Sequence, residues 1–199
     1  MIVLLRHGWT EGGKGRCVGR TALPLSPEGR TQALSLIDDL GGIPFARLCS
    51  SPASRAQATV APLAERLGLG VEILPALDEI DMGAWDGLSF NEIRARFPEE
   101  YAARGQRLGN YRAPDGESFA DVAERAMAAL AELAAGPQPV LVTTHAGVIR
   151  SVLCRVTGHP LDGLFRFSPG CGRCTVLRPN GTFELVADDV FARSVRDLL

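Results

Sequence analysis

Short apolar runs of strand length alternate along this chain with longer stretches in which apolar residues recur at helical spacing. The short runs lie at residues 2–5, 45–50, 71–74 and 140–144. Runs of this length and composition are typical of strands buried between helices in a parallel sheet. The alternation therefore predicts consecutive βαβ units.

Capping signals indicate where the first two helices begin. Ser26 as an N-cap, followed by Pro27 in the first turn, predicts the start of a helix. Ser51 or Ser54 is expected to open a second helix. Pro62 falls inside that second helix and predicts a kink, because proline lacks the amide hydrogen that a helix interior uses.

Two further helices are predicted in the second half of the chain. Apolar residues recur at helical spacing from Phe119 to Leu133, which indicates a long amphipathic helix that begins near Ser118. Another helix is expected over residues 148–156, directly after the fourth apolar run. Each helix follows or precedes a strand, as a layered α/β domain requires.

Two segments fall outside this alternation. Residues 90–111 are polar, aromatic and compatible with helix, so we expect a small cap-like insertion there. Residues 174–177 and 183–186 flank Asn180-Gly181, which predicts a hairpin before a short terminal helix.

The chain has 199 residues, 46% of them hydrophobic, and no linker-like segment divides it. A chain of this size can bury a substantial core, so we expect a single domain over residues 1–199. The predicted fold class is α/β: a three-layer α/β/α sandwich with a mainly parallel, mixed central sheet. One edge strand is allowed to run antiparallel.

Charge and cysteine content exclude several classes of protein. The formal net charge is −2 and basic residues do not cluster, which argues against a nucleic-acid surface. No apolar run reaches membrane-spanning length and the first residues lack the features of a signal peptide, so a cytoplasmic protein is expected. Five cysteines, an odd number, fit a reducing compartment. Cys171 and Cys174 have C-x-x-C spacing without a second ligand pair, so two structural cysteines are favoured over a metal or redox site.

Two of the three histidines directly follow predicted strands. His7 follows the run at 2–5 and Arg6, and His145 follows the run at 140–144. The carboxyl ends of parallel strands form the ligand-binding edge of an α/β sheet. A guanidinium such as that of Arg6 is costly to bury there unless an anion or a carboxylate meets it. The sequence therefore predicts one pocket that contains both imidazoles.

Five segments in this order resemble the histidine phosphatase superfamily, which includes the phosphoglycerate mutases. The resemblance spans about residues 1–155 and rests on Leu5-Arg6-His7-Gly8-Trp9-Thr10 and on the segments 50–56, 77–87, 114–118 and 144–150. It implies a phosphoglycerate mutase-like fold and a metal-independent phosphatase that needs no cofactor.

The resemblance also implies a role for each matching residue. Arg6 and Arg55 would grip the phosphoryl oxygens, and His145 would add a further donor. His7 would attack phosphorus and form a phosphohistidine, and Glu79 would act as the general acid and base. The neighbouring arginines are expected to lower the pKa of His7 and so keep it a nucleophile.

Substrate preference rests on a single loop. Residues 15–29 look most like the α-ribazole phosphatase branch, which acts in assembly of the cobalamin nucleotide loop. Thr10, Arg20 and Thr21 would then bind substrate. A broad-specificity phosphomonoesterase and a phosphoglycerate mutase are the alternatives. The expected partner is a small phosphate ester, bound by a monomer or homodimer.

Other interpretations stay open at this stage. Arg55 alone would be taken as a surface arginine, Trp85 as a packing residue, and Glu117 with Ser118 as the start of a helix. Arg150 is as compatible with a structural pair as with the pocket. The chain as a whole could be a phosphate-binding regulator without turnover. A metalloprotein built on scattered histidines, cysteines and aspartates is the third hypothesis.

Overall fold

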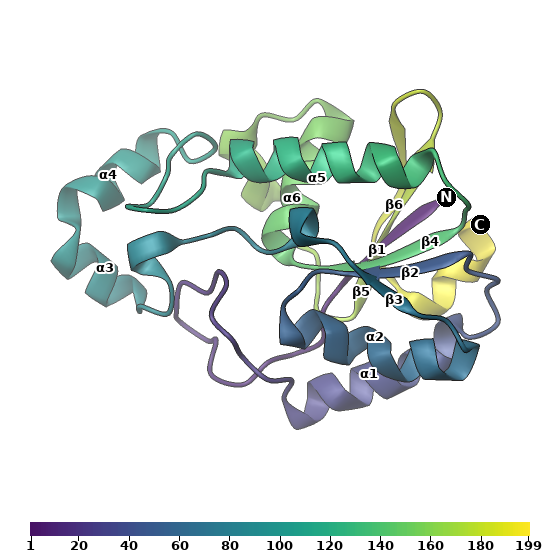
Figure 1. Ribbon diagram of the computed structural model, residues 1–199. Coiled ribbons are helices and arrows are strands. Elements are labelled where there is room, and N and C mark those ends of the chain that lie inside the picture. Colours follow the sequence, from purple (N-terminus) through teal and green to yellow (C-terminus); the bar gives the residue numbers. More distant parts are fainter.

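The computed structural model describes residues 1–199 and contains one six-stranded sheet (Figure 1). The strands follow the order β3-β2-β4-β1-β5-β6 across the sheet. Their bounds are Ile2–Arg6 for β1, Arg47–Ser50 for β2, Val71–Ile73 for β3, Val140–Thr144 for β4, Arg173–Pro179 for β5 and Phe183–Phe191 for β6. All four apolar runs of the sequence form strands, as predicted.

The sheet is mixed. Strands β3, β2, β4 and β1 are parallel to one another, β5 pairs antiparallel with β1, and β6 pairs antiparallel with β5. The predicted architecture is confirmed, but the antiparallel strand lies one position inside the edge. The reason is the C-terminal hairpin: its first strand β5 pairs with β1, so its second strand β6 becomes the edge.

Helices cover both faces of the sheet (Figure 1). Helices α1 and α2 lie on one face, and α5 and α6 on the other. Their bounds are Pro27–Leu40 for α1, Ser54–Leu67 for α2, Phe119–Ala134 for α5 and Ala146–Thr157 for α6. Four short 3-10 helices are η1 Pro75–Leu77, η2 Gly83–Trp85, η3 Leu161–Arg166 and η4 Ala192–Leu198.

The alternation of side chains along β1 produces two hydrophobic cores. Val3 and Leu5 join the cluster that packs against α1 and α2, whereas Ile2 and Leu4 join the cluster that packs against α5 and α6. Successive side chains of a strand point to opposite faces, so a continuously apolar strand must be covered on both sides. This explains why β1 lies in the middle of three layers.

The helix starts follow the capping signals in part. Ser26 caps α1 and Ser118 caps α5, each accepting a backbone hydrogen bond. Helix α2 begins at Ser54 but has no side-chain cap, and it continues through Pro62. Helix α6 begins at Ala146, two residues earlier than predicted.

Residues 90–111 form two short helices, α3 (Phe90–Arg96) and α4 (Pro98–Gln106), that extend beyond the layered body (Figure 1). Trp85 packs against this segment, because the centroid of its buried ring lies 5.5 Å from that of Tyr111 and 6.3 Å from that of Tyr101 in α4. The packing role expected of Trp85 is therefore confirmed. The grouping of residues 90–111 as a cap of a single domain stays a prediction.

The C-terminal segment contains the predicted hairpin and a short 3-10 helix, η4, in the place of the terminal helix. Cys174 lies in β5, and Cys171 precedes that strand; both are buried free thiols. Burial raises the pKa of Cys174 to about 12. None of the helices combines the length and the apolar character needed to cross a membrane.

Candidate active site

The register of the central strands brings the two histidines together. Arg6 at the end of β1 pairs with Thr144 at the end of parallel strand β4. The next amide, that of His7, donates to the Thr144 carbonyl at 3.0 Å. The imidazole of His7 therefore lies beside that of His145, with ring centroids 5.2 Å apart. The expectation that two histidines far apart in sequence share one site is met.

Local contacts determine which nitrogen of His7 is free. Nδ1 lies 2.8 Å from the carbonyl oxygen of Gly8, which can only accept a hydrogen bond. Nδ1 therefore carries the proton, and Nε2 keeps its lone pair. Burial lowers the pKa of His7 well below its usual range, and His145, Arg55 and Arg6 lower that pKa further. The predicted direction is correct, but desolvation contributes more than the arginines do.

Backbone carbonyls hold Arg6 and Arg55 in place, and each guanidinium keeps a buried N–H group without a hydrogen-bond partner. Arg55 is almost fully buried and donates to the carbonyls of Gly19 and Thr21 at 2.8 and 2.9 Å. Arg6 donates to the carbonyl of Pro169 at 2.7 Å. In both guanidinium groups the Nε–H is buried without a hydrogen-bond partner. A buried unpaired donor is costly, so each position is suited to an anion.

His145 presents a similar arrangement. Its Nε2 lies 2.7 Å from the hydroxyl of Ser51 and 3.5 Å from the carboxylate of Asp78, while its Nδ1 is buried without a partner. Burial lowers the pKa of His145, and both Asp78 and Glu79 oppose that shift. An anion beside Nδ1 would further favour the protonated ring. His145 can then act as a third donor.

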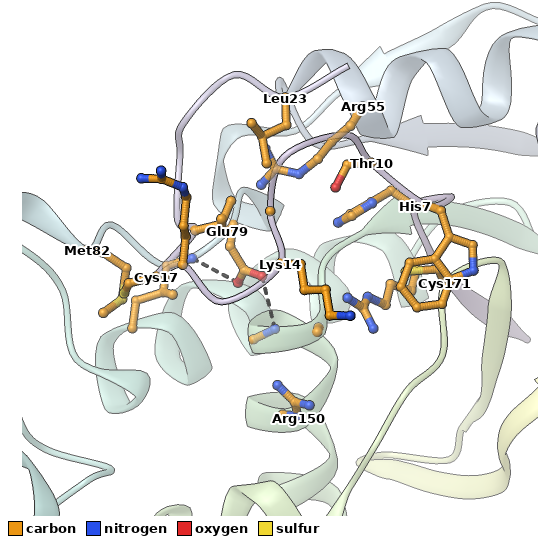
Figure 2. A pocket seen from close by; sticks show the side chains of 18 of the residues that line it. His7, Thr10, Lys14, Cys17, Leu23, Arg55, Glu79, Met82, Arg150 and Cys171 are labelled. Atoms are coloured by element: carbon orange, nitrogen blue, oxygen red, sulfur yellow. Dashed lines mark hydrogen bonds between the residues drawn. The ribbon is translucent and has the colours of Figure 1, made fainter. Parts of the chain in front are cut away.

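Glu79 reaches the site from the loop after η1. Its carboxylate accepts hydrogen bonds from the amides of Ile80 at 3.0 Å and Gly147 at 3.2 Å (Figure 2). A Cβ atom on Gly147 would lie 2.3 Å from the carboxylate, so only glycine allows this approach. The first turn of α6 therefore fixes the position of the Glu79 carboxylate.

The side chains of Arg6, His7, Arg55 and Glu79 line a cavity of about 700 Å³ (Figure 2). The cavity is large enough for a phosphate ester with a sizeable alcohol. Its lining includes apolar residues from several elements, such as Trp9, Leu23 and Phe165. Six cationic side chains and one carboxylate line it: Arg6, Lys14, Arg16, Arg55, Arg104 and Arg150, with Glu79.

A match to a known protein family identifies the family of this chain. The sequence matches the histidine phosphatase superfamily (branch 1) over residues 2–187. This chain belongs to the histidine phosphatase superfamily. The resemblance of the five sequence segments is thereby confirmed for nearly the whole chain. Named members of the superfamily are hydrolases that act on phosphate esters, so the expected enzyme class is confirmed at the level of the family.

Individual relatives differ in length and in name. The human 6-phosphofructo-2-kinase/fructose-2,6-bisphosphatase 1 is 35% identical over 164 residues, which cover 82% of this chain and 34% of that protein. The chain thus spans about a third of the length of that curated relative. The glucosyl-3-phosphoglycerate phosphatase of Mycobacterium tuberculosis is 34% identical over 176 residues, covering 80% of this chain and 76% of the relative.

A solved structure shows the same fold. The α-ribazole phosphatase from Shigella flexneri superposes with a TM-score of 0.86 at 25% identity, and the match covers 96% of this chain and 97% of the other. The match therefore extends beyond residues 1–155, the part of the chain that carried the sequence resemblance.

Not all expected site residues of this histidine phosphatase reach the cavity. Thr10 lines it together with Arg6, His7, Arg55 and Glu79. His145 lies just behind the lining, fully buried against His7.

Arg20 and Thr21, expected to bind substrate, do not line the cavity. The guanidinium of Arg20 instead forms ion pairs with three carboxylates: Asp78 at 3.7 Å, Asp81 at 3.2 Å and Glu117 at 3.1 Å. Thr21 contributes its backbone, because its carbonyl accepts from Arg55. The competing carboxylates explain the difference from the expectation.

Several functional positions were missed or left undecided. Arg150 lines the cavity, with its guanidinium 5.0 Å above the ring of Phe165 and its Nε–H bonded to the Phe167 carbonyl. Ser51 binds His145 instead of opening a helix. Thr59 accepts from the amide of Gly8 at 3.0 Å. Ser51 and Arg150 lie in the segments 50–56 and 144–150 that carry the family resemblance, and this was their sequence signal.

Proposed function

We propose that this chain hydrolyses a phosphate monoester through a phosphohistidine on His7. One observation carries the proposal. Around the neutral imidazole of His7, three buried nitrogens lack hydrogen-bond partners: Nε of Arg6, Nε of Arg55 and Nδ1 of His145. A tetrahedral dianion would satisfy all three, and preorganised donors of this kind stabilise a phosphoryl group during transfer.

The first step transfers the phosphoryl group to the enzyme. Nε2 of His7 attacks phosphorus while the bond from phosphorus to the alcohol oxygen breaks. The departing oxygen takes a proton from Glu79, the one carboxylic acid in the cavity lining. Arg6 and Arg55 hold the equatorial oxygens throughout.

The second step regenerates the enzyme. A water molecule attacks phosphorus and gives a proton to Glu79 while the bond between phosphorus and Nε2 of His7 breaks. Inorganic phosphate leaves, and Glu79 is again protonated for the next cycle. The use of one carboxyl group as acid and then as base follows from its position beside both the leaving and the entering oxygen.

The charge of the cavity lining supports one substrate class over another. Lys14, Arg16, Arg104 and Arg150 line the cavity in addition to the two arginines beside His7, and none of the four has a carboxylate within ion-pair distance. This excess favours an alcohol that bears its own acid group, as in glucosyl-3-phosphoglycerate. α-Ribazole 5'-phosphate is the second candidate, supported by the loop at residues 15–29 and by the structural match.

The insertion also contributes to the proposed substrate site. Phe90 at the start of α3 and Arg104 of α4 both line the cavity. We therefore propose that residues 90–111 act as a cap over the alcohol part of the substrate.

The intermediate is tested directly. The enzyme is mixed with 4-nitrophenyl phosphate and quenched, and protein-bound phosphate is assayed for stability. Acid-labile, base-stable phosphate is expected in the wild type and in His159→Ala, since His159 lines a separate cavity. His7→Ala should hold none, and full activity of His7→Ala contradicts the proposal. Protection from heat by phosphate without any turnover would instead indicate a regulator.

Substrate class is tested by a screen. Values of kcat/KM are compared for glucosyl-3-phosphoglycerate, α-ribazole 5'-phosphate, phosphoglycerates, sugar phosphates and 4-nitrophenyl phosphate. An acid-bearing alcohol is expected to rank first. A preference for α-ribazole 5'-phosphate would select the second candidate, and equal values would indicate a broad-specificity phosphomonoesterase.

A further inference from the structure

We propose that Arg125 and Glu117 form a positioning pair that holds the Glu79 loop against the active site. The inference rests on the proposed role of Glu79 as acid and base. Neither residue lines the cavity, so neither is a catalytic residue. The two residues are close in sequence: Arg125 lies in α5, and Glu117 directly precedes the N-cap of that helix, Ser118.

Arg125 binds the backbone of Glu79 and of the residues just before it. Its Nη1 donates to the carbonyls of Ala76 and Asp78, each at 2.8 Å, and its Nη2 donates to the carbonyl of Glu79 at 3.1 Å. One guanidinium therefore holds three carbonyls within four residues. The loop from Asp78 to Asp81 belongs to no helix or strand, so such contacts replace those of regular secondary structure.

Glu117 closes the other end of the loop. The amide of Glu117 donates to the carbonyl of Asp81 at 2.8 Å, and the amide of Asp81 donates to the Glu117 carboxylate at 3.0 Å. The same carboxylate accepts from Nε and Nη2 of Arg125, both at 3.0 Å. Arg20 adds a third cationic contact at 3.1 Å. Glu117 is thus more than the start of a helix, which was the interpretation favoured from sequence.

The geometry connects this pair to the Glu79 carboxylate. The backbone of Glu79 is held from the α5 side by Arg125, while its side chain is held from the α6 side by the amide of Gly147. Asp78, whose carbonyl also binds Arg125, places its carboxylate 3.5 Å from Nε2 of His145. A shift of this loop would therefore move the acid–base group and the support of the second histidine together.

Arginine is required because of its shape. Its planar group presents five N–H donors in a fixed arrangement, and all of the distances above use that arrangement. Lysine carries the same charge with a single ammonium group and cannot reach three carbonyls and a carboxylate at once. Substitution Arg125→Lys should thus keep the charge but release the loop.

The test uses two substrates that differ in their need for an acid. The alkoxide of an alkyl phosphate needs a proton as it leaves, whereas 4-nitrophenyl phosphate releases 4-nitrophenolate, which leaves as the anion without a proton. For Arg125→Lys and Arg125→Met, kcat/KM for the alkyl phosphate is expected to fall about 100-fold, the scale of a displacement of roughly 1 Å. The value for 4-nitrophenyl phosphate should fall only a few-fold.

Controls separate positioning from folding. Arg112→Met loses an ion pair to Asp121, which lies in α5 like Arg125. The values of kcat/KM of this variant for both substrates should stay near those of the wild type. Rates are corrected for the folded fraction from urea denaturation. In a Glu79→Gln background, Arg125→Lys should have no further effect on the alkyl phosphate, because the group it positions is gone.

The outcomes are distinct. Equal losses on both substrates in either Arg125 variant, or additive losses with Glu79→Gln, would overturn the inference while the phosphatase assignment stands. A wild-type protein that hydrolyses no monoester would overturn the proposed function itself.

Discussion

At the scale of single residues, the site combines the neutral imidazole of His7, the proposed nucleophile, with buried nitrogens of Arg6, Arg55 and His145 that lack a hydrogen-bond partner. The carbonyl of Gly8 orients His7, and backbone carbonyls orient Arg6 and Arg55. Fixed partners of this kind reduce the reorganisation that phosphoryl transfer requires. The consequences are measurable in pH dependence and in the tolerance of one glycine.

The buried His7 should make stability depend on pH. Its folded pKa lies below the unfolded value near 6.5, so the unfolded chain takes up a proton first as pH falls. The stability from neutral His7 is complete above pH 6.5 and is lost below it. Between pH 6.5 and 5, the free energy of unfolding should fall less steeply with falling pH in His7→Gln than in the wild type, by up to about 1.4 kcal/mol per pH unit. Urea denaturation at several pH values measures this, and identical slopes would contradict it.

Gly147→Ala should impair activity without unfolding the protein. The added Cβ would lie 2.3 Å from a carboxylate oxygen of Glu79, so the side chain must move away. A fall in kcat of about 100-fold is expected. Ser151→Ala is the control, because this buried hydroxyl in the same helix has no hydrogen-bond partner. A Gly147→Ala enzyme as active as the control would refute the expectation.

At the scale of elements, helices do more than cover the sheet. The start of α6 supplies an amide to Glu79, whereas α5 supplies Arg125, and the residue before its N-cap is Glu117. Helix α2 supplies Arg55 and, one turn later, Thr59. The hydroxyl of Thr59 accepts from the amide of Gly8 and donates to the carbonyl of Arg55 at 2.7 Å. Thr59 therefore links α2 to the loop that follows β1.

Thr59→Val should destabilise the fold by about 1–3 kcal/mol, because the buried amide of Gly8 loses its acceptor. Thr31→Val is a matched control: its hydroxyl also bonds a carbonyl four residues back, but on the exposed face of α1. The control should change stability by less than about 0.5 kcal/mol. Urea denaturation compares the two, and equal effects would show that Thr59 is not a link.

At the scale of the whole molecule, charge is distributed unevenly. The chain carries a net charge of −2, yet six cations and one carboxylate line the cavity. Acidic residues are gathered elsewhere, as in the group that holds Arg20. The protein therefore directs its positive field into the cavity, where an anionic substrate enters.

This field predicts a dependence on salt. Raising the ionic strength from about 0.01 to 0.15 M shortens the screening length from roughly 30 to 8 Å, so KM for an acid-bearing substrate should rise. The rise should be smaller for 4-nitrophenyl phosphate and smaller in Arg104→Gln, which removes one cation of the lining. Steady-state kinetics at constant pH provide the measurement, and a salt-independent KM would contradict the prediction.

Features that depend on neighbours along the chain could be predicted before the fold was known. The caps Ser26 and Ser118 bind amides three residues away, and apolar runs of strand length make strands wherever both faces can be covered. The histidines at two strand ends also follow from sequence, because parallel strands place their carboxyl ends together.

The pairing of polar side chains that are far apart in sequence could not be predicted and was found in the folded arrangement. From the sequence, Arg20 could face the cavity or turn away from it. In the structure it turns away and binds Glu117, a residue 97 positions later. The contact between Arg125 and Glu79 spans 46 positions, and no local pattern announces it. The physical reason is that a side chain with several donors takes whichever acceptors packing brings within reach, and that packing exists only in the folded molecule.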